Sequence, residues 1–73
     1  MDSRINRNRK CLNIPIGTPV EISFVPAPVT NIKLYATGVT ASHVKQIGMI
    51  KRVDVQLDDG RLIGWNLDYL NII

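Results

Sequence analysis

The chain has 73 residues, and nine lysines and arginines against six acids give it a formal net charge of +3. A chain of this length forms one domain, and its small core leaves a thin margin of stability, roughly 3–5 kcal/mol. A single cysteine, Cys11, excludes an intramolecular disulfide and is simplest to interpret as an unreactive thiol in a reducing compartment. Without an apolar signal core or a membrane-length run, the sequence predicts a soluble cytoplasmic protein.

The positive charge is concentrated at the N-terminus. Residues 1–11 carry four cations against one acid, whereas five cations balance five acids in residues 12–73. We therefore expect a flexible basic tail over residues 1–11 and a folded domain over residues 12–73. The tail either solubilises the protein or contacts nucleic-acid phosphates or an acidic protein surface. Its cations are Arg4, Arg7, Arg9 and Lys10.

Alternation of apolar and polar side chains predicts the first strand over residues 18–25. Val20, Ile22 and Phe24 would share one face of this strand. A proline-rich stretch then ends the strand, and a long connection follows over residues 26–43.

This connection is unusually apolar for a loop, and part of it has enough strand propensity to form a hairpin arm. Two interpretations stay open. Its apolar side chains fold back to fill a small core, or some of them form a patch for a protein partner. The candidate patch residues are Leu34, Tyr35 and Val39.

Residues 40–52 are ambiguous between helix and strand. Apolar residues recur at three-residue steps, as in a helix that Ser42 could cap. Gly48 lies inside the segment and would cost a helix about 1 kcal/mol relative to alanine. We favour a turn that runs into a strand over residues 47–50, followed by a tight turn at Lys51-Arg52.

The stretch of residues 53–67 predicts a β-hairpin, because Asp58-Asp59-Gly60 is a turn signal between alternating segments. A two-residue turn would place the apolar side chains of the second strand beside acidic side chains of the first. A three-residue loop instead pairs Val53 with Trp65 and collects the apolar side chains on one face. We predict this loop, with Gly60 in the left-handed conformation that glycine adopts without steric cost.

The alternating period ends after the hairpin. Leu67 and Leu70 lie three residues apart, which fits a single 3₁₀ turn, and residues 71–73 would form a last short strand. Trp65 is either a core side chain or a half-exposed anchor at an interface.

This order of elements resembles an SH3-like barrel, an all-β fold of about five strands with a long loop after the first strand and a 3₁₀ turn before the last. At residue level, Asp59-Gly60-Arg61, Gly64 and Asp68-Tyr69-Leu70 resemble the end of eukaryotic SH3 domains. The chain lacks that family's acidic Ala-Leu-Tyr-Asp-Tyr stretch, its paired tryptophans and its proline before the 3₁₀ turn. Those positions build the proline-peptide groove, so the resemblance does not imply that binding activity.

Two further resemblances concern partners. The pairs Ile16-Gly17 and Ile47-Gly48, each followed by a spacer and aliphatic residues, are similar to KOW-type SH3-like barrels, which implies contact with RNA or the ribosome. The architecture also resembles small SH3-like accessory subunits, including those of cyanobacterial electron-transfer complexes, which implies docking on a larger assembly.

No constellation of residues predicts catalysis, a cofactor or a metal ion. His43 is the only histidine and has no cysteine near it in sequence. Asp58 and Asp59 are adjacent turn acids, whereas the acids of a hydrolase come from separate elements facing one gap. We expect a protein that is not an enzyme.

Two functions fit the sequence. The first is an adaptor or accessory subunit that docks on a larger protein complex through the apolar loop, with Leu34, Tyr35, Val39 and Trp65 as candidate contacts. The second is binding of the RNA or DNA backbone, although four aromatic residues are too few for a stacking platform. Its candidate contacts are Arg4, Arg7, Arg9, Lys10, Lys51 and Arg52.

Overall fold

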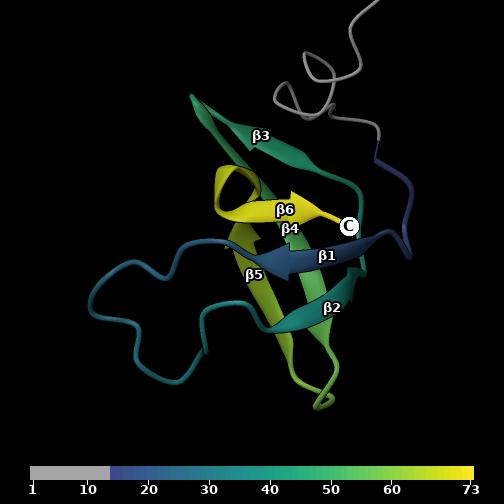
Figure 1. Ribbon diagram of the computed structural model, residues 1–73. Helices are drawn as coiled ribbons and strands as arrows, with labels where there is room; N and C mark the ends of the chain where they lie inside the picture. The colour runs from purple at the N-terminus through teal and green to yellow at the C-terminus, as the bar shows by residue number, and fades with distance from the viewer. Residues whose placement is uncertain (1–13) are drawn as a thin grey trace, which may run out of the picture.

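A computed structural model describes residues 14–73, and the expectations for the tail of residues 1–11 and for Cys11 lie outside the described residues. The described chain forms one sheet of six antiparallel strands with a 3₁₀ turn before the last (Figure 1). The elements are β1 (Pro19–Ile22), β2 (Thr37–Thr40), β3 (Lys45–Ile47), β4 (Ile50–Leu57), β5 (Leu62–Asn66), the 3₁₀ turn η1 (Leu67–Tyr69) and β6 (Leu70–Ile72).

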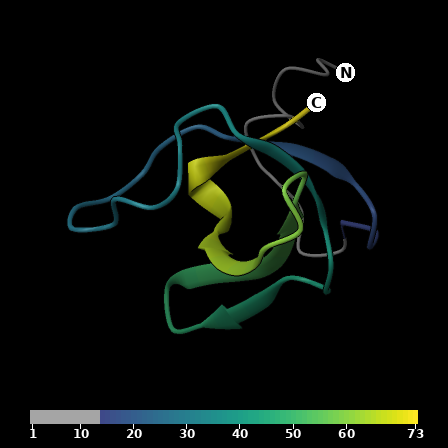
Figure 2. The same ribbon diagram turned by 90° about the horizontal axis from the view of Figure 1, so that it is seen from below.

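The sheet curls into a half-barrel around β4, its longest strand. One edge of β4 pairs with β3 near its start and with β2 near its end, while the other edge pairs with β5. The strand β1 then pairs with both β2 and β6. Figure 2 shows the strands wrapping around the interior, so the all-β prediction is confirmed.

The predicted hairpin register is confirmed. Val53 lies opposite Trp65, and the Leu57 N–H donates to the Arg61 carbonyl at 2.8 Å, which closes the predicted three-residue loop. Gly60 has a φ of +95°, the left-handed conformation that this loop requires.

A long loop after the first strand is also confirmed, but its bounds differ from the prediction. β1 ends at Ile22, and the loop spans residues 23–36 because β2 begins at Thr37. Phe24 therefore lies outside the sheet and is 50% exposed, and the prediction that it shares a strand face with Val20 and Ile22 is wrong. Val39, predicted in the loop, lies on β2.

Residues 45–52 form a strand, a turn and the start of a second strand rather than a helix, but the strand predicted over residues 47–50 and the turn predicted at Lys51-Arg52 are both wrong. The chain turns at Gly48-Met49, where Gly48 has a φ of +61°. Lys51 and Arg52 lie on β4 and pair with Gln46 and Lys45 of β3. This extra hairpin raises the strand count to six.

The core lies inside the curled sheet and contains ten buried apolar residues. Alternate residues of β4 point into it, and the 3₁₀ turn η1 adds its first residue, as its three-residue period predicts. The core residues are Ile14, Val20, Ile22, Ile32, Val53, Val55, Leu57, Trp65, Leu67 and Leu70. Across residues 14–73 no helix has the length and hydrophobicity needed to cross a membrane.

The strands β2 and β4 approach each other closely at Gly38, which lies opposite Leu57. A Cβ atom at Gly38 would lie 2.3 Å from the Gln56 carbonyl oxygen and 2.9 Å from the Leu57 Cα. No other residue fits at this position without moving a strand, because both obstacles are backbone atoms.

Candidate protein-binding groove

An open groove of about 270 Å³ lies between the loop of residues 23–36, the start of β4, and the segment from β5 into η1. This volume is below the usual range for small-molecule sites, about 300–1,000 Å³, and suits one or two amino-acid side chains. The lining residues are Pro26, Val29, Ile50, Arg52, Gly64, Trp65, Asn66 and Tyr69.

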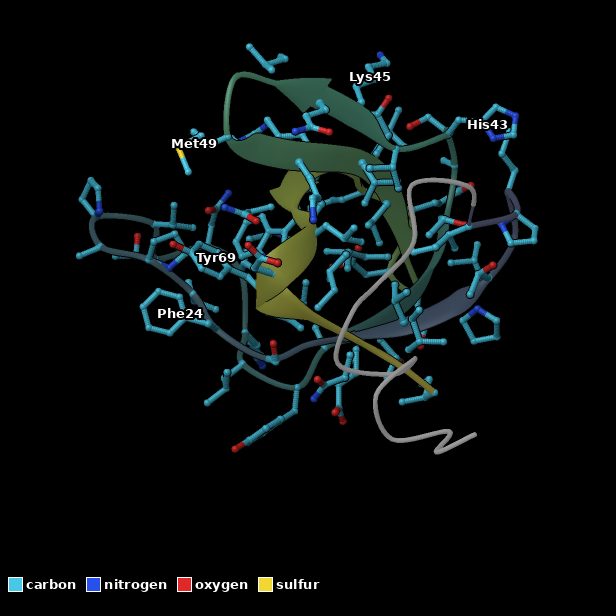
Figure 3. All side chains as sticks on the ribbon, turned by 90° about the horizontal axis from the view of Figure 1, so that it is seen from above. Phe24, His43, Lys45, Met49 and Tyr69 are labelled. Carbon is cyan, nitrogen blue, oxygen red and sulfur yellow. The ribbon has the colours of Figure 1, made fainter. Side chains whose placement is uncertain are left out.

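One wall of the groove is aromatic. Tyr69, in η1, packs edge-to-face against Phe24 of the loop, with ring centroids 4.8 Å apart and an interplanar angle of 62°. Such a pair stabilises by about 1 kcal/mol beyond its buried area. It therefore ties the loop to the 3₁₀ turn and fixes this wall. Figure 3 shows Met49, Tyr69 and Phe24 along one side of the molecule, with His43 on the opposite side.

Trp65 belongs both to the core and to the groove, so the two alternatives for this residue coexist. The side chain is only 6% exposed, yet it lines the groove from the end of β5. Its indole N–H is the one buried side-chain polar atom in residues 14–73 without a hydrogen-bond partner. Buried tryptophans usually satisfy this donor, so Trp65 is an exception.

Arg52 lies across the backbone of β5 in the groove. Its Nη2 donates to the Gly64 carbonyl at 3.0 Å. A Cβ atom at position 64 would lie 3.3 Å from that nitrogen, so the glycine makes room for the guanidinium. Within the described range, residues 14–73, the single ion pair joins Arg61 to Asp59 at 2.7 Å, which leaves Arg52 without a carboxylate partner there.

The β3–β4 hairpin extends the apolar surface beyond the groove. Its turn residue Met49 is 95% exposed, and Ile47 and Ile50 beside the turn are 67% and 50% exposed. In Figure 1 the tip of this hairpin and the loop of residues 23–36 project on the same side, away from the C-terminus. Exposed apolar side chains gathered beside a groove are typical of an interaction surface.

The candidate residues from the sequence divide among several places. Trp65 lines the groove, whereas Leu34, Tyr35 and Val39 are exposed and lie outside its lining. Tyr35 also has a φ of +69°, a strained conformation for a tyrosine. The tail cations Arg4, Arg7, Arg9 and Lys10 lie outside the described residues.

The two nucleic-acid candidates on β4 point to different faces, because neighbouring side chains of a strand alternate. Arg52 lines the groove, and Lys51 lies on the other face of the β3–β4 pair.

Sequence reasoning did not identify Phe24 and Tyr69 as contacting neighbours. Their local signal was an aromatic residue just before the proline-rich stretch and another inside the 3₁₀ turn.

The ion pair and its hydrogen bonds lie at the distal turn, residues 58–61 between β4 and β5, and not in the groove. The Arg61 side chain donates to Asp59, and this hydrogen bond, followed by one from the Arg61 backbone, holds the Asp59 pKa below its ordinary value of 3.8. Over residues 14–73 no cluster of three or more His, Cys, Asp and Glu side chains could hold a metal ion. His43 is exposed in the connection between β2 and β3.

The fold and the site together define a small all-β half-barrel with a side-chain-sized apolar groove on its surface. No family model, no curated protein and no solved structure matches the chain. The functional interpretation therefore rests on the geometry and the charges of the groove.

Proposed function

We propose that the protein is a non-enzymatic binding module that docks on a larger protein complex by holding an extended segment of its partner in the groove. The observation that carries this proposal is the composition of the lining, where Pro26, Val29, Ile50, Trp65 and Tyr69 surround a volume of about 270 Å³. One large apolar side chain of the partner fills this space and acts as the anchor of the interface.

We also propose that the fold is an SH3-like barrel. The long loop, the three-residue hairpin loop and the 3₁₀ turn before the last strand support this assignment. The absence of the proline-groove positions from the sequence argues against a proline-rich ligand. Leu34, Tyr35 and Val39 serve at most as a secondary contact, because they lie outside the groove lining.

Selection from a displayed library of random ten-residue peptides tests the proposal. The selected peptides are then titrated against the full chain, with the fluorescence of Trp65, the sole tryptophan, as the signal. Ile50→Ala should weaken binding about tenfold, since it removes a wall of the anchor pocket. Val39→Ala, which truncates a comparable exposed side chain on β2, should change binding less than about twofold.

Two results would contradict the proposal. Failure to select any peptide would remove the groove as a docking site. A loss of binding in Val39→Ala but not in Ile50→Ala would move the site to the patch of Leu34, Tyr35 and Val39.

The second candidate function is binding of the RNA or DNA backbone. Its support is that residues 45–52, around the turn of the β3–β4 hairpin, contain Lys45, Lys51 and Arg52 and no acid, in addition to the four cations of residues 1–11. Binding of labelled duplex DNA and RNA is measured against salt for the chain and for a variant with glutamine at the four tail positions. Neutralising four phosphates gives a log–log slope of about −3, which should vanish in the variant. No binding at low salt would remove this candidate.

A further inference from the structure

The β3–β4 hairpin brings two cations directly opposite each other. Lys45 on β3 pairs with Arg52 on β4, and both side chains are exposed. Directly opposite side chains share one face of an antiparallel pair, with Cβ atoms about 5 Å apart, and like charges in this arrangement destabilise it. The one ion pair within residues 14–73 involves neither of them, so no carboxylate in that range lies within 4 Å of either cation, although Asp54 shares the outer face of β4 with Arg52. An anion bound between the two cations would relieve their repulsion.

This cation pair is continuous with the apolar groove. The next pair on the same face of the hairpin is Ile47 with Ile50, because side chains alternate along each strand. Ile50 and Arg52 both line the groove. The groove therefore presents an apolar position and a cationic position two residues apart along β4, a separation of about 7 Å.

The surrounding charges favour an acidic occupant. The loop of residues 23–36 contains Lys33 and no acid, and residues 45–52 contain three cations and no acid. Two acids lie next to the lining: Asp54 on β4, whose carboxylate oxygen is 3.7 Å from where a Cβ of Gly64 would be, and Asp68 in η1. The four cations of the two segments outnumber them. Since the tail of residues 1–11 is itself basic, charge repulsion disfavours it as the occupant.

Arg52 is oriented to receive a carboxylate. Its Nη2 is already held by the Gly64 carbonyl, so the guanidinium loses little freedom when its remaining N–H groups bind a ligand. Arginine binds carboxylates through two parallel hydrogen bonds, an arrangement that a planar, pre-positioned guanidinium favours.

We infer that the groove recognises an acidic peptide segment in which an apolar side chain and an aspartate or glutamate lie two residues apart. The apolar side chain enters the groove, and the carboxylate binds the Lys45–Arg52 pair. This inference rests on the proposed function and names the chemistry of the partner segment.

The displayed library tests the inference through the composition of the selected peptides. We expect enrichment of an acid two residues from an apolar anchor. Neutral or basic selected sequences would overturn the acidic specificity and leave the groove as a peptide site. A library that yields no binder would overturn both the inference and the proposed function.

Matched variants and peptides locate the carboxylate. Replacing the acid of a selected peptide with its amide should weaken binding about fivefold, the upper end for an exposed charge pair, and the loss should be smaller at high salt. In Arg52→Gln, which leaves Lys45 as the remaining cation of the pair, the difference between the acid and amide peptides should shrink to less than about twofold. Lys51→Gln removes the same charge from the neighbouring residue on the other face, and it should preserve the difference between the peptides. Equal effects of the two variants, or displacement of the peptide by duplex DNA at equal charge concentration, would overturn the inference.

Discussion

Replacing Gly38 with alanine should unfold much of the protein. The new Cβ would lie 2.3 Å from the Gln56 carbonyl oxygen, whereas ordinary contacts begin near 3.4 Å. Neither this oxygen nor the Leu57 Cα belongs to a side chain that can rotate away. The strands β2 and β4 must therefore separate by about 1 Å, close to the point where the loop of residues 23–36 joins β2.

The cost follows from the local geometry. Overpacking in a well-packed interior costs about 1–3 kcal/mol. Separation of the strands weakens the hydrogen bonds on either side of Gly38, at about 1 kcal/mol for each bond. A total of about 3–5 kcal/mol equals the whole margin that a domain of this size has.

Urea unfolding followed by far-ultraviolet circular dichroism and Trp65 fluorescence measures this loss. Gly64→Ala is the matched control, because its Cβ would meet side-chain atoms rather than backbone, the Arg52 guanidinium at 3.3 Å and the Asp54 carboxylate at 3.7 Å. The control should change the free energy of unfolding by less than about 1 kcal/mol. The steric argument would be refuted if the free energy of unfolding of Gly38→Ala stayed within about 1 kcal/mol of the parent value, which is a fifth to a third of the margin.

Three further predictions concern the loop and the distal turn. Phe24→Ala should cost about 1 kcal/mol in the free energy of unfolding and weaken peptide binding, since Tyr69 loses its edge-to-face partner. Tyr35→Gly should raise the free energy of unfolding by about 1 kcal/mol, because glycine adopts a φ of +69° without strain. Arg61→Gln should return the Asp59 pKa toward 3.8 in an NMR titration, because it removes the hydrogen bonds of the Arg61 side chain.

Each of these predictions has a control or a contradicting result. Leu62→Ala removes an exposed side chain of β5 and should cost less than about 0.5 kcal/mol, against the larger loss in Phe24→Ala. Tyr35→Ala keeps a side chain at positive φ and should not stabilise. Because the Asp59 pKa is lower in the folded state, its ionised form stabilises the fold above pH 3.8, and this stabilisation is lost as the pH falls through the folded-state pKa. An unchanged Asp59 pKa in Arg61→Gln would contradict the Arg61 hydrogen bonds as the cause.

The hairpin and the 3₁₀ turn were predictable because their determinants are local. Only one register places the apolar residues of both strands on one face, and the same register gives Gly60 its left-handed position. Leu67 and Leu70 are both buried, as a single 3₁₀ turn between β5 and β6 requires.

The turn of the β3–β4 hairpin was predicted at the wrong residues for a physical reason. Its strands extend beyond the core, so polar side chains lie on both faces and Lys51-Arg52 looks like a turn in the sequence. Gly48, treated as a residue that breaks a helix, is the turn residue. Exposure of all three residues of β3 removes the alternation that identifies a strand.

The groove could not be predicted from local patterns, because its walls come from three separate segments. The sequence identified Trp65 as a protein contact and Arg52 as a nucleic-acid contact. The structure brings both into one groove. The predicted hairpin register already brings these two close, since Arg52 pairs with Asn66 and Val53 with Trp65. The wall of Pro26 and Val29 comes from the long loop, and no local pattern places it there.

The pairing of β1 with β6 has a consequence for the order of folding. Val20 lies opposite Ile72, about fifty residues later, whereas a three-residue loop joins β4 to β5. Loop-closure entropy makes the first contact roughly 2 kcal/mol harder to form than the second. The floor of the groove, formed by β4, β5 and η1, therefore assembles early, and the wall of Pro26 and Val29 joins it once β1 has docked. The groove is therefore complete only in the fully folded chain, and a chain in which β1 has not docked lacks the wall of Pro26 and Val29.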